Sequence, residues 1–350
     1  SCTLFQNRDR GLINGGVQYI IRQFCRCNRA PVFMELIRGI HNLRSEHVGC
    51  VLTIGNFDGV HRGHQAVLSR LQEQASQLGL PSCVMVFEPQ PLEFFAGDKA
   101  PARLSRLRDK YEAIAALNID RLLCVKFDHA FAELTAAEFI EQILVRKLAV
   151  RFLVIGDDFR FGLQRRGDFA LLVEAGRQYG FQVLSTDTLL HDQQRVSSTL
   201  LREALREGRL EDVSHMLGHP YTITGRVAHG AKLGRTIGFP TANIHLKRLV
   251  VPVQGVYAVQ VLIADAIHFG VANIGFRPTV NGTRSQLEVH IFDFKGDLYG
   301  KQLQIQVCHK LRDEQKFPSF SALQTQITMD ARQARQWFGL PVTHVEPDGI

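Results

Sequence analysis

The sequence predicts an α/β domain built on a doubly wound parallel sheet, followed by a small antiparallel β-barrel and a C-terminal helix. From about residue 50 to residue 185, short apolar segments alternate with amphipathic ones, as strands and helices do in parallel sheets. After about residue 219, strand-like segments follow one another with short links, which indicates an antiparallel sheet or small barrel. A last amphipathic segment, about 319–338, predicts the closing helix.

The first part of the chain is expected to hold five strands and four helices. Strands are expected at residues 50–54, 82–87, 121–127, 152–155 and 181–184. Helices are expected at 63–78, 105–117 and 167–179, and another begins after Thr135, where Thr-Ala-Ala-Glu has the form of a capping box. Such sheets bind ligands outside the carboxyl ends of their strands.

The second part reads as successive strands. They are expected at residues 221–227, 255–263, 266–274, 286–294 and 302–311. Apolar and polar residues alternate clearly in 287–292 and 303–307, and Ala264 and Asp265 are expected to form a tight turn. The joint between the two parts is expected near residues 209–220.

Composition places the chain among globular proteins and bounds its ligands. At 350 residues it is long enough for two domains, and 45% of its residues are hydrophobic and 21% charged. No apolar run reaches the roughly 18 residues that a membrane-spanning helix needs. The net charge of +7 favours anionic ligands such as nucleotides, phosphates or nucleic acid.

The seven cysteines are scattered and odd in number, which favours buried thiols in a reducing cytoplasm over a disulfide framework. Residues 1–33 differ from the rest, with several arginines, one acidic residue and no clear periodicity. We expect them to be an upstream extension, with Met34 as the natural start. A targeting peptide is the alternative, but no clean apolar core with a small-residue cleavage site is visible.

The segment Gly55-Asn56-Phe57-Asp58-Gly59-Val60-His61-Arg62-Gly63-His64 follows an apolar strand and leads into a predicted helix. His61 and His64 would share one helix face, and Gly63 would let a phosphate approach the backbone. The helix N-terminus adds oriented N–H donors. These groups suit a phosphorus centre that gains negative charge in its transition state. Zinc is an alternative, for which no third ligand is evident.

The segment resembles the nucleotidyltransferase superfamily, whose hallmark is His-x-Gly-His after the first strand. It is most similar to the adenylyltransferase half of the bacterial bifunctional riboflavin kinase/FMN adenylyltransferases, the prokaryotic FAD synthetases. Residues 156–162 and the Ser-Ser-Thr-x-x-Arg loop within 195–202 support this resemblance. A Phe-Glu-Pro-Gln-Pro segment matches the flavin side of that family.

A second candidate site lies in Gly230–Asn243. Its Gly-x-x-x-Gly-Arg-Thr differs from a Walker A loop, and a strand rather than a helix is expected after it. The hydroxyl of Thr241 and the amide oxygen of Asn243 are hard ligands suited to Mg²⁺. Glu288 lies among alternating apolar residues, and parity alone leaves open whether it faces solvent or acts as a base.

This second segment resembles the riboflavin kinases, with their glycine-rich loop, Pro-Thr-Ala-Asn motif and catalytic glutamate. The resemblance implies a Rossmann-like nucleotidyltransferase domain at 34–217 and a riboflavin kinase barrel at 218–345. It implies that riboflavin and ATP give FMN, that FMN and a second ATP give FAD, and that Mg²⁺ assists. The resemblance assigns catalysis to His61, His64 and Glu288, and flavin contacts to Phe87, Pro89 and Arg312. In the first domain it assigns nucleotide binding to Gly55, Asn56, Phe57, Asp58, Gly63, Asp158, Arg195, Ser198, Thr199 and Arg202. In the barrel it assigns nucleotide binding to Gly230, Lys232, Gly234, Thr241 and Asn243, and Thr241 and Asn243 are also the expected Mg²⁺ ligands.

Two other functions stay open at this point. The chain could be a nucleotidyltransferase for another acceptor with a passive barrel, in which case Glu288 would have no role. It could also bind nucleic acid through a basic barrel, although the second half lacks regularly interleaved aromatic and basic residues. The expected partners are small molecules rather than nucleic acid or membrane, and self-association is left open.

Overall fold

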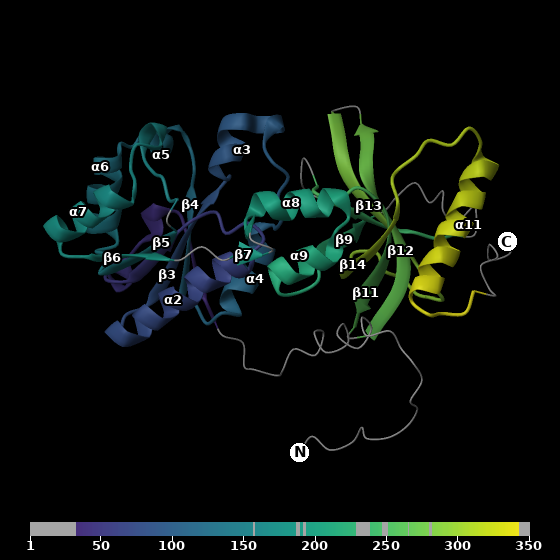
Figure 1. The fold of residues 1–350 in the computed structure, drawn as a ribbon, viewed down its shortest axis with the longest axis horizontal. Helices are drawn as coiled ribbons and strands as arrows, with labels where there is room; N and C mark the ends of the chain where they lie inside the picture. Colours follow the sequence, from purple (N-terminus) through teal and green to yellow (C-terminus); the bar gives the residue numbers. More distant parts are fainter. Residues whose placement is uncertain are drawn as a thin grey trace, which may run out of the picture. The chain divides into compact units, whose positions relative to one another are not determined.

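The computed structural model describes residues 33–156, 158–186, 190–191, 194–228, 239–246, 251–264, 266–279 and 282–342. Two folded regions follow one another in the chain, an α/β region and a β-barrel (Figure 1). No helix in these ranges is both long and apolar enough to cross a bilayer.

The α/β region is built on a six-stranded parallel sheet of order β1-β4-β3-β2-β5-β6. The strands are β1 (Glu35–Arg38), β2 (Val51–Ile54), β3 (Ser82–Glu88), β4 (Arg121–Lys126), β5 (Phe152–Gly156) and β6 (Gln182–Thr186). The strand order reverses between β2 and β5, which is where doubly wound sheets open a ligand-binding crevice. The predicted parallel sheet is therefore confirmed.

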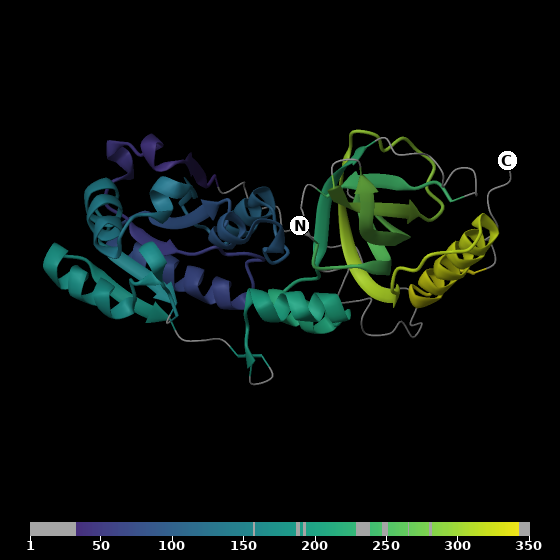
Figure 2. The same cartoon turned by 90° about the horizontal axis from the view of Figure 1, so that it is seen from above.

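Helices cover both faces of this sheet (Figure 2). On one face α2 (Arg62–Leu78) and α4 (Leu107–Ala115) pack against Val51, Val84 and Val154. On the other face η4 (Phe139–Lys147) and α7 (Phe169–Tyr179) pack against the alternate strand residues, such as Leu52 and Leu153. The alternation follows from the two-residue period of a strand. Shorter helical segments are η1 (Ile40–Asn42), η2 (Ser45–His47), α3 (Pro91–Ala96), η3 (Gly97–Lys99), α5 (His129–Ala132), α6 (Ala136–Glu138) and η5 (Leu163–Arg165).

The capping box at Thr135 is present. The Thr135 hydroxyl accepts a hydrogen bond from the backbone amide of Glu138, and the Glu138 carboxylate accepts one from the backbone amide of Thr135.

Two elements differ from the sequence expectation. The edge strand β1 was not expected, since its four residues carry too little pattern, and pairing with β4 stabilises it. The expected joint near 209–220 contains the helix α9 (Leu210–Leu217), which follows α8 (Ser198–Glu207). A short pair, β7 (Leu190–His191) and β8 (Gln194–Arg195), precedes α8.

The second region is a closed antiparallel barrel of order β10-β13-β12-β11-β14-β9. Its strands are β9 (Thr222–Ala228), β10 (Ala242–His245), β11 (Gly255–Ile263), β12 (Ala266–Thr279), β13 (Gly282–Ile291) and β14 (Gln302–Arg312). Ile263 pairs with Ala266, as expected for a two-residue turn, although Asp265 lies outside the described residues. The predicted barrel is confirmed, and β10 is the strand that was expected after the glycine-rich loop.

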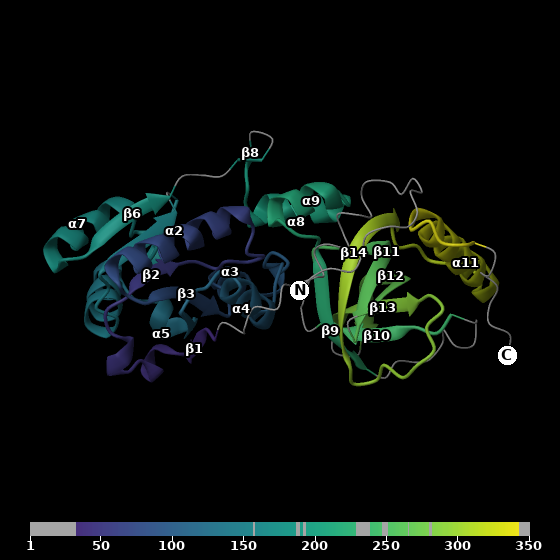
Figure 3. The same cartoon turned by 90° about the horizontal axis from the view of Figure 1, so that it is seen from below.

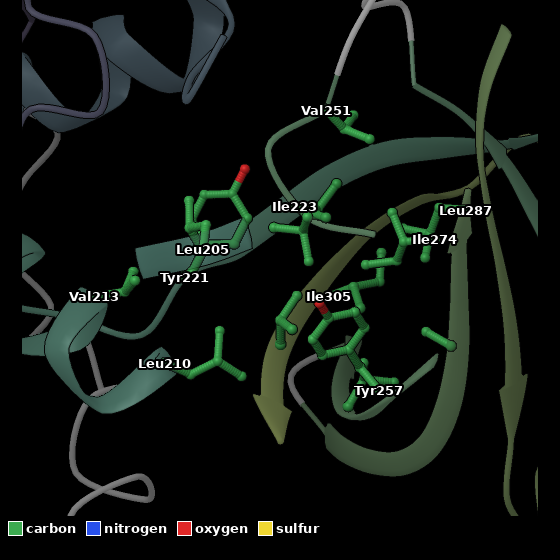
Figure 4. Close-up of a cluster of buried hydrophobic side chains, with 14 of the residues drawn as sticks. Leu205, Leu210, Val213, Tyr221, Ile223, Val251, Tyr257, Ile274, Leu287 and Ile305 are labelled. Atoms are coloured by element: carbon green, nitrogen blue, oxygen red, sulfur yellow. The ribbon is translucent and has the colours of Figure 1, made fainter. Parts of the chain in front are cut away.

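The barrel core includes the two preceding helices. Leu205 of α8 and Leu210 and Val213 of α9 belong to the same buried cluster as Ile223 and Ile305 of the barrel (Figure 4). The C-terminal helix α11 (Phe320–Trp337) packs outside the barrel against β11, β12 and β14 (Figure 3). Its Ala331 and Ala334 let it approach the sheet closely.

Candidate active sites

The first site begins where β2 ends and α2 starts. His61 is the N-cap of α2, and its Nδ1 accepts a hydrogen bond from the backbone amide of His64 at 3.3 Å. A side chain at Gly63 would lie 3.1 Å from that Nδ1 and 3.3 Å from the carbonyl oxygen of Val196, so the position has little room beyond glycine. Phe57 and Val60 adopt positive φ angles of 46° and 42°, conformations that residues with side chains rarely occupy.

The two imidazoles are stacked, with ring centroids 3.6 Å apart and an interplanar angle of 17°. Burial lowers the pKa of His61 to about 4. The negative charge of Asp58 raises this pKa, and the positive charges of Arg195 and Arg202 lower it. Burial, with His61 and Lys110 nearby, also places the pKa of His64 well below its usual value. Both rings are therefore neutral at pH 7 before a ligand binds. Because His61 Nδ1 is an acceptor, its proton lies on Nε2.

His64 Nδ1 is buried and has no hydrogen-bond partner among the described residues. Buried polar atoms of proteins are almost always paired, so such an atom needs an explanation. The hydroxyl oxygen of Thr53, a residue that lines the cavity beside the histidines, is also buried without a hydrogen-bond partner among the described residues.

Asp58 has a mainly structural set of contacts. Its carboxylate is 2% exposed and accepts hydrogen bonds from the backbone amides of Leu104 and Ser105. It also pairs with Arg202 at 2.6 Å, across 144 residues of sequence. These contacts hold the start of α8 and the segment before α4 against the loop of the histidines.

A cavity of about 1100 Å³ opens beside the histidines. Among the predicted residues, those that line it are Gly55, Asn56, Phe57, Asp58, His61, Gly63, His64, Phe87, Asp158, Arg195 and Ser198. Asp158 and Arg195 pair at 2.8 Å on its more exposed side. Thr199, Arg202 and Pro89 are described but do not belong to the lining, and Arg202 is engaged with Asp58.

One side of the cavity is an aromatic wall, consisting of Phe87, Phe94, Phe95, Phe127, Phe131, Phe159 and Phe161. Sequence reasoning found only Phe87 of these. The available indication was composition, since the chain has 23 phenylalanines but only 6 tyrosines and 1 tryptophan. Phe95 is 69% exposed at the cavity, which is unusual for so large an apolar side chain.

The helix α3, which carries Phe94 and Phe95, is fastened to the end of β3 by one arginine. Arg103 donates to both carboxylate oxygens of Glu88 and to both of Glu93. All three side chains are at least two-thirds buried. The pairing of one guanidinium with two carboxylates holds part of the aromatic wall in place.

The second site lies on the barrel, where β10 and β13 are neighbours. Asn243 is directly opposite Glu288 in this antiparallel pair, so the two side chains lie on the same face. Leu287 and Val289 are fully buried in the barrel core. Glu288 therefore faces the other side of β13, away from the barrel core, and is half-buried there.

A glutamine that sequence reasoning missed connects these two residues. Gln286 Nε2 lies 2.6 Å from Asn243 Oδ1 and 2.9 Å from Glu288 Oε1. Thr241 lies just before β10 and is half-buried. The predicted residues Gly230, Lys232 and Gly234 lie outside the described residues.

Arg312 has a different set of contacts from the flavin contact expected of it. Its guanidinium forms two hydrogen bonds with the buried carboxylate of Asp330 on α11, at 2.9 and 2.7 Å. Arg335 of α11 pairs with Asp293 at 2.8 Å. The two pairs fasten α11 to the barrel.

Within the described ranges, no three His, Cys, Asp or Glu side chains gather as a metal site would require. The zinc alternative for His61 and His64 therefore has no support in this part of the chain. A magnesium ion held mainly by nucleotide phosphates needs fewer protein ligands, and the oxygens of Thr241 and Asn243 suit it.

Comparison with known proteins agrees with the two-site geometry. Residues 43–200 match the FAD synthetase family and residues 217–338 match the riboflavin kinase family. The chain is 56% identical over 309 residues to the bifunctional riboflavin kinase/FMN adenylyltransferase of Escherichia coli K12, covering 88% of this chain and 99% of that protein. The protein of that name from Haemophilus influenzae is 53% identical over 306 residues, covering 87% and 99%.

A crystal structure named for a macrolide-efflux protein from Streptococcus pneumoniae shares the fold. It has a TM-score of 0.73 and 28% sequence identity, and the match covers 87% of this chain and all of that one. The fold similarity thus extends across both regions. Together with the two family matches and the identity to its bacterial relatives, it shows that the chain belongs to the bifunctional riboflavin kinase/FMN adenylyltransferase family.

Proposed function

We propose that the two activities of this bifunctional enzyme, which together make FAD, use separate sites in residues 34–217 and 218–345. The first domain adenylylates FMN in the cavity beside His61 and His64. The second phosphorylates riboflavin beside Asn243 and Glu288. The observation that supports this best is the stacked imidazole pair at the N-terminus of α2. The pair lines a cavity that is also lined by phenylalanines.

In the first reaction, a phosphate oxygen of FMN attacks the α-phosphorus of ATP. A new O–P bond forms, the bond from the α-phosphorus to the bridging oxygen breaks, and pyrophosphate leaves. The phosphate is already an anion, so no general base is needed. His61 and His64 would donate N–H bonds to the oxygens that gain charge, together with Arg195 and the backbone amides at the start of α2.

The aromatic wall suits the flat apolar rings of a flavin. Such rings stack on or meet aromatic edges favourably, and burying them removes apolar surface from water. Phe87 stays our predicted flavin contact, and we add Phe95 because its exposed ring lines the cavity. Gly55, Asn56, Asp158 and Ser198 would contact the nucleotide.

In the second reaction, Glu288 would accept the proton of the riboflavin 5′-hydroxyl. That oxygen attacks the γ-phosphorus of ATP, the bond to the β-phosphate oxygen breaks, and ADP leaves. Thr241 and Asn243 would hold Mg²⁺–ATP, with Gly230, Lys232 and Gly234 around the phosphates. When bound, Mg²⁺ neutralises phosphate charge.

Two minor assignments complete the proposal. The free thiols of Cys50 and Cys83 are buried within the sheet, which suits a reducing cytoplasm. Arg312, bound to Asp330, would hold α11, and its contact with the flavin stays a prediction. Thr199 and Arg202 would support the first site from behind its lining.

The proposal is tested by incubating the purified chain with riboflavin, ATP and Mg²⁺ and separating the flavins by chromatography. FMN should appear first and FAD later. A second arm supplies FMN in place of riboflavin and should give FAD directly. A folded protein that leaves riboflavin and FMN unchanged in both arms would contradict the proposal.

A further inference from the structure

Gln286 lies between the two polar side chains assigned to phosphoryl transfer. It precedes Glu288 by two residues on β13, so both side chains are on the same face of that strand. Its Nε2 is within hydrogen-bond distance of Asn243 Oδ1, at 2.6 Å, and of Glu288 Oε1, at 2.9 Å. Because an amide nitrogen carries two hydrogens, it can donate one to each acceptor.

This arrangement is shielded from water. Gln286 is 9% exposed and Asn243 is 7% exposed. Hydrogen bonds between buried groups are stronger than exposed ones, and an unpaired buried polar group is costly. The amide of Gln286 therefore restricts the side-chain freedom of Asn243 and Glu288 together, although they belong to different strands.

We propose that Gln286 is a positioning residue of the kinase, whose amide fixes Asn243 and Glu288 relative to each other. The inference rests on the proposed roles of those two residues. Asn243 acts on the nucleotide and Glu288 on the riboflavin hydroxyl, so their separation decides whether the hydroxyl meets the γ-phosphorus in line. A misplacement of about 1 Å in such a step can lower a rate about 100-fold.

A positioning role has a signature of its own. The fixed geometry acts on the reaction step, so its loss should lower kcat and leave KM for riboflavin nearly unchanged. A role in barrel stability alone would not produce that split.

The chain offers a matched control in Gln306. This glutamine is 4% exposed on β14 of the same barrel and pairs in register with Gln260 of β11, away from β10 and β13. Replacing it with methionine removes a buried amide from the same barrel without touching Asn243 or Glu288.

The experiment compares Gln286→Met and Gln286→Asn with Gln306→Met and the unchanged chain. Methionine keeps the length and removes the donors, whereas asparagine keeps an amide that is too short to reach both acceptors. For each protein, kcat and KM for FMN formation are measured, along with thermal unfolding. FAD formation from supplied FMN reports on the other site in the same molecule.

We expect Gln286→Met to lower kcat for FMN formation by about 10- to 100-fold, with KM for riboflavin changed less than about threefold. Gln286→Asn should lower kcat for FMN formation in the same way, and FAD formation from FMN should be unchanged in both variants. A folded Gln286→Met protein with normal kcat would overturn the inference. So would a Gln306→Met protein that loses as much kcat as Gln286→Met at the same loss of stability.

A Glu288→Gln variant separates this inference from the function on which it rests. Loss of FMN formation in Glu288→Gln with normal activity in Gln286→Met would refute only the role of Gln286. Normal FMN formation in Glu288→Gln would refute the assigned base itself.

Discussion

The two sites are constructed in opposite ways. The proposed adenylyltransferase site takes its central groups from one short segment, because His61 caps the helix that carries His64. The proposed kinase site takes its groups from two strands that are distant in sequence and joined by register, Asn243 opposite Glu288. In the first site a single motif shows that the two histidines are neighbours. In the second, resemblance names Asn243 and Glu288, but only the fold shows that they are opposite each other.

The sharpest test of this comparison is Glu288→Gln. Glutamine has nearly the same shape but cannot accept the proton, so FMN formation should fall by about 10²- to 10⁴-fold. FAD formation from supplied FMN should stay within about twofold. Chromatography of the flavins measures both rates in one preparation, and an equal fall in both would show that the sites are not separate.

His64→Ala should produce the converse result. FAD formation should fall about 10²- to 10³-fold, because a donor to the reacting phosphate is lost. FMN should then accumulate from riboflavin at its normal rate. If His64→Ala left FAD formation unchanged, the stacked imidazoles would have no part in the reaction.

Asp58→Ala tests how far the first site depends on long-range contacts. Removing the carboxylate leaves Arg202 largely buried without its partner, which should cost the α/β region about 3 kcal/mol or more. The exposed pair Asp158–Arg195 gives a matched control, since Asp158→Ala should change stability by less than about 1 kcal/mol.

Two probes distinguish the regions in urea unfolding of these variants. The single tryptophan, Trp337, lies on α11 beside the barrel and reports that region by fluorescence. Circular dichroism reports both regions. Asp58→Ala should shift the α/β transition in circular dichroism more than the fluorescence transition, and equal shifts would mean that the regions unfold as one.

The smallest expected effect concerns pH. The pKa of His61 is about 4 in the folded protein and near 6.5 when unfolded. Below pH 6.5 the unfolded chain therefore binds a proton that the folded chain does not. Stability from this group is complete above pH 6.5 and falls as the pH drops toward 4, by up to about 3 kcal/mol.

His61→Asn should flatten this dependence, because asparagine can still cap α2 but does not titrate. Urea midpoints between pH 7 and 4.5 measure the slope. His64 contributes with the same sign, so some slope should remain in the variant. Identical slopes in the two proteins would indicate that His61 is not buried in its neutral form.

Much of the fold could be predicted because its patterns are periodic. Strand β11 begins and ends at the expected residues, and α11 differs by one residue at each end. The short strand β1 could not be predicted, since four residues carry little pattern and depend on a neighbour for pairing. The strand β10 was expected after the glycine-rich loop, but its four residues were too few to set its bounds. The aromatic wall was missed as a whole because its phenylalanines come from several segments, and no single segment shows that they meet.

The sequence by itself determined what depends on neighbours along the chain: the two regions, the capped start of α2, and the histidine pair. Helix caps and strand alternation act over a few residues, so they can be read directly. The tertiary structure decided the neutral state of the imidazoles, the engagement of Asp58 with Arg202, and the contact of Gln286 with Asn243. These depend on burial and on which strands become neighbours, and both are settled only when distant segments pack together.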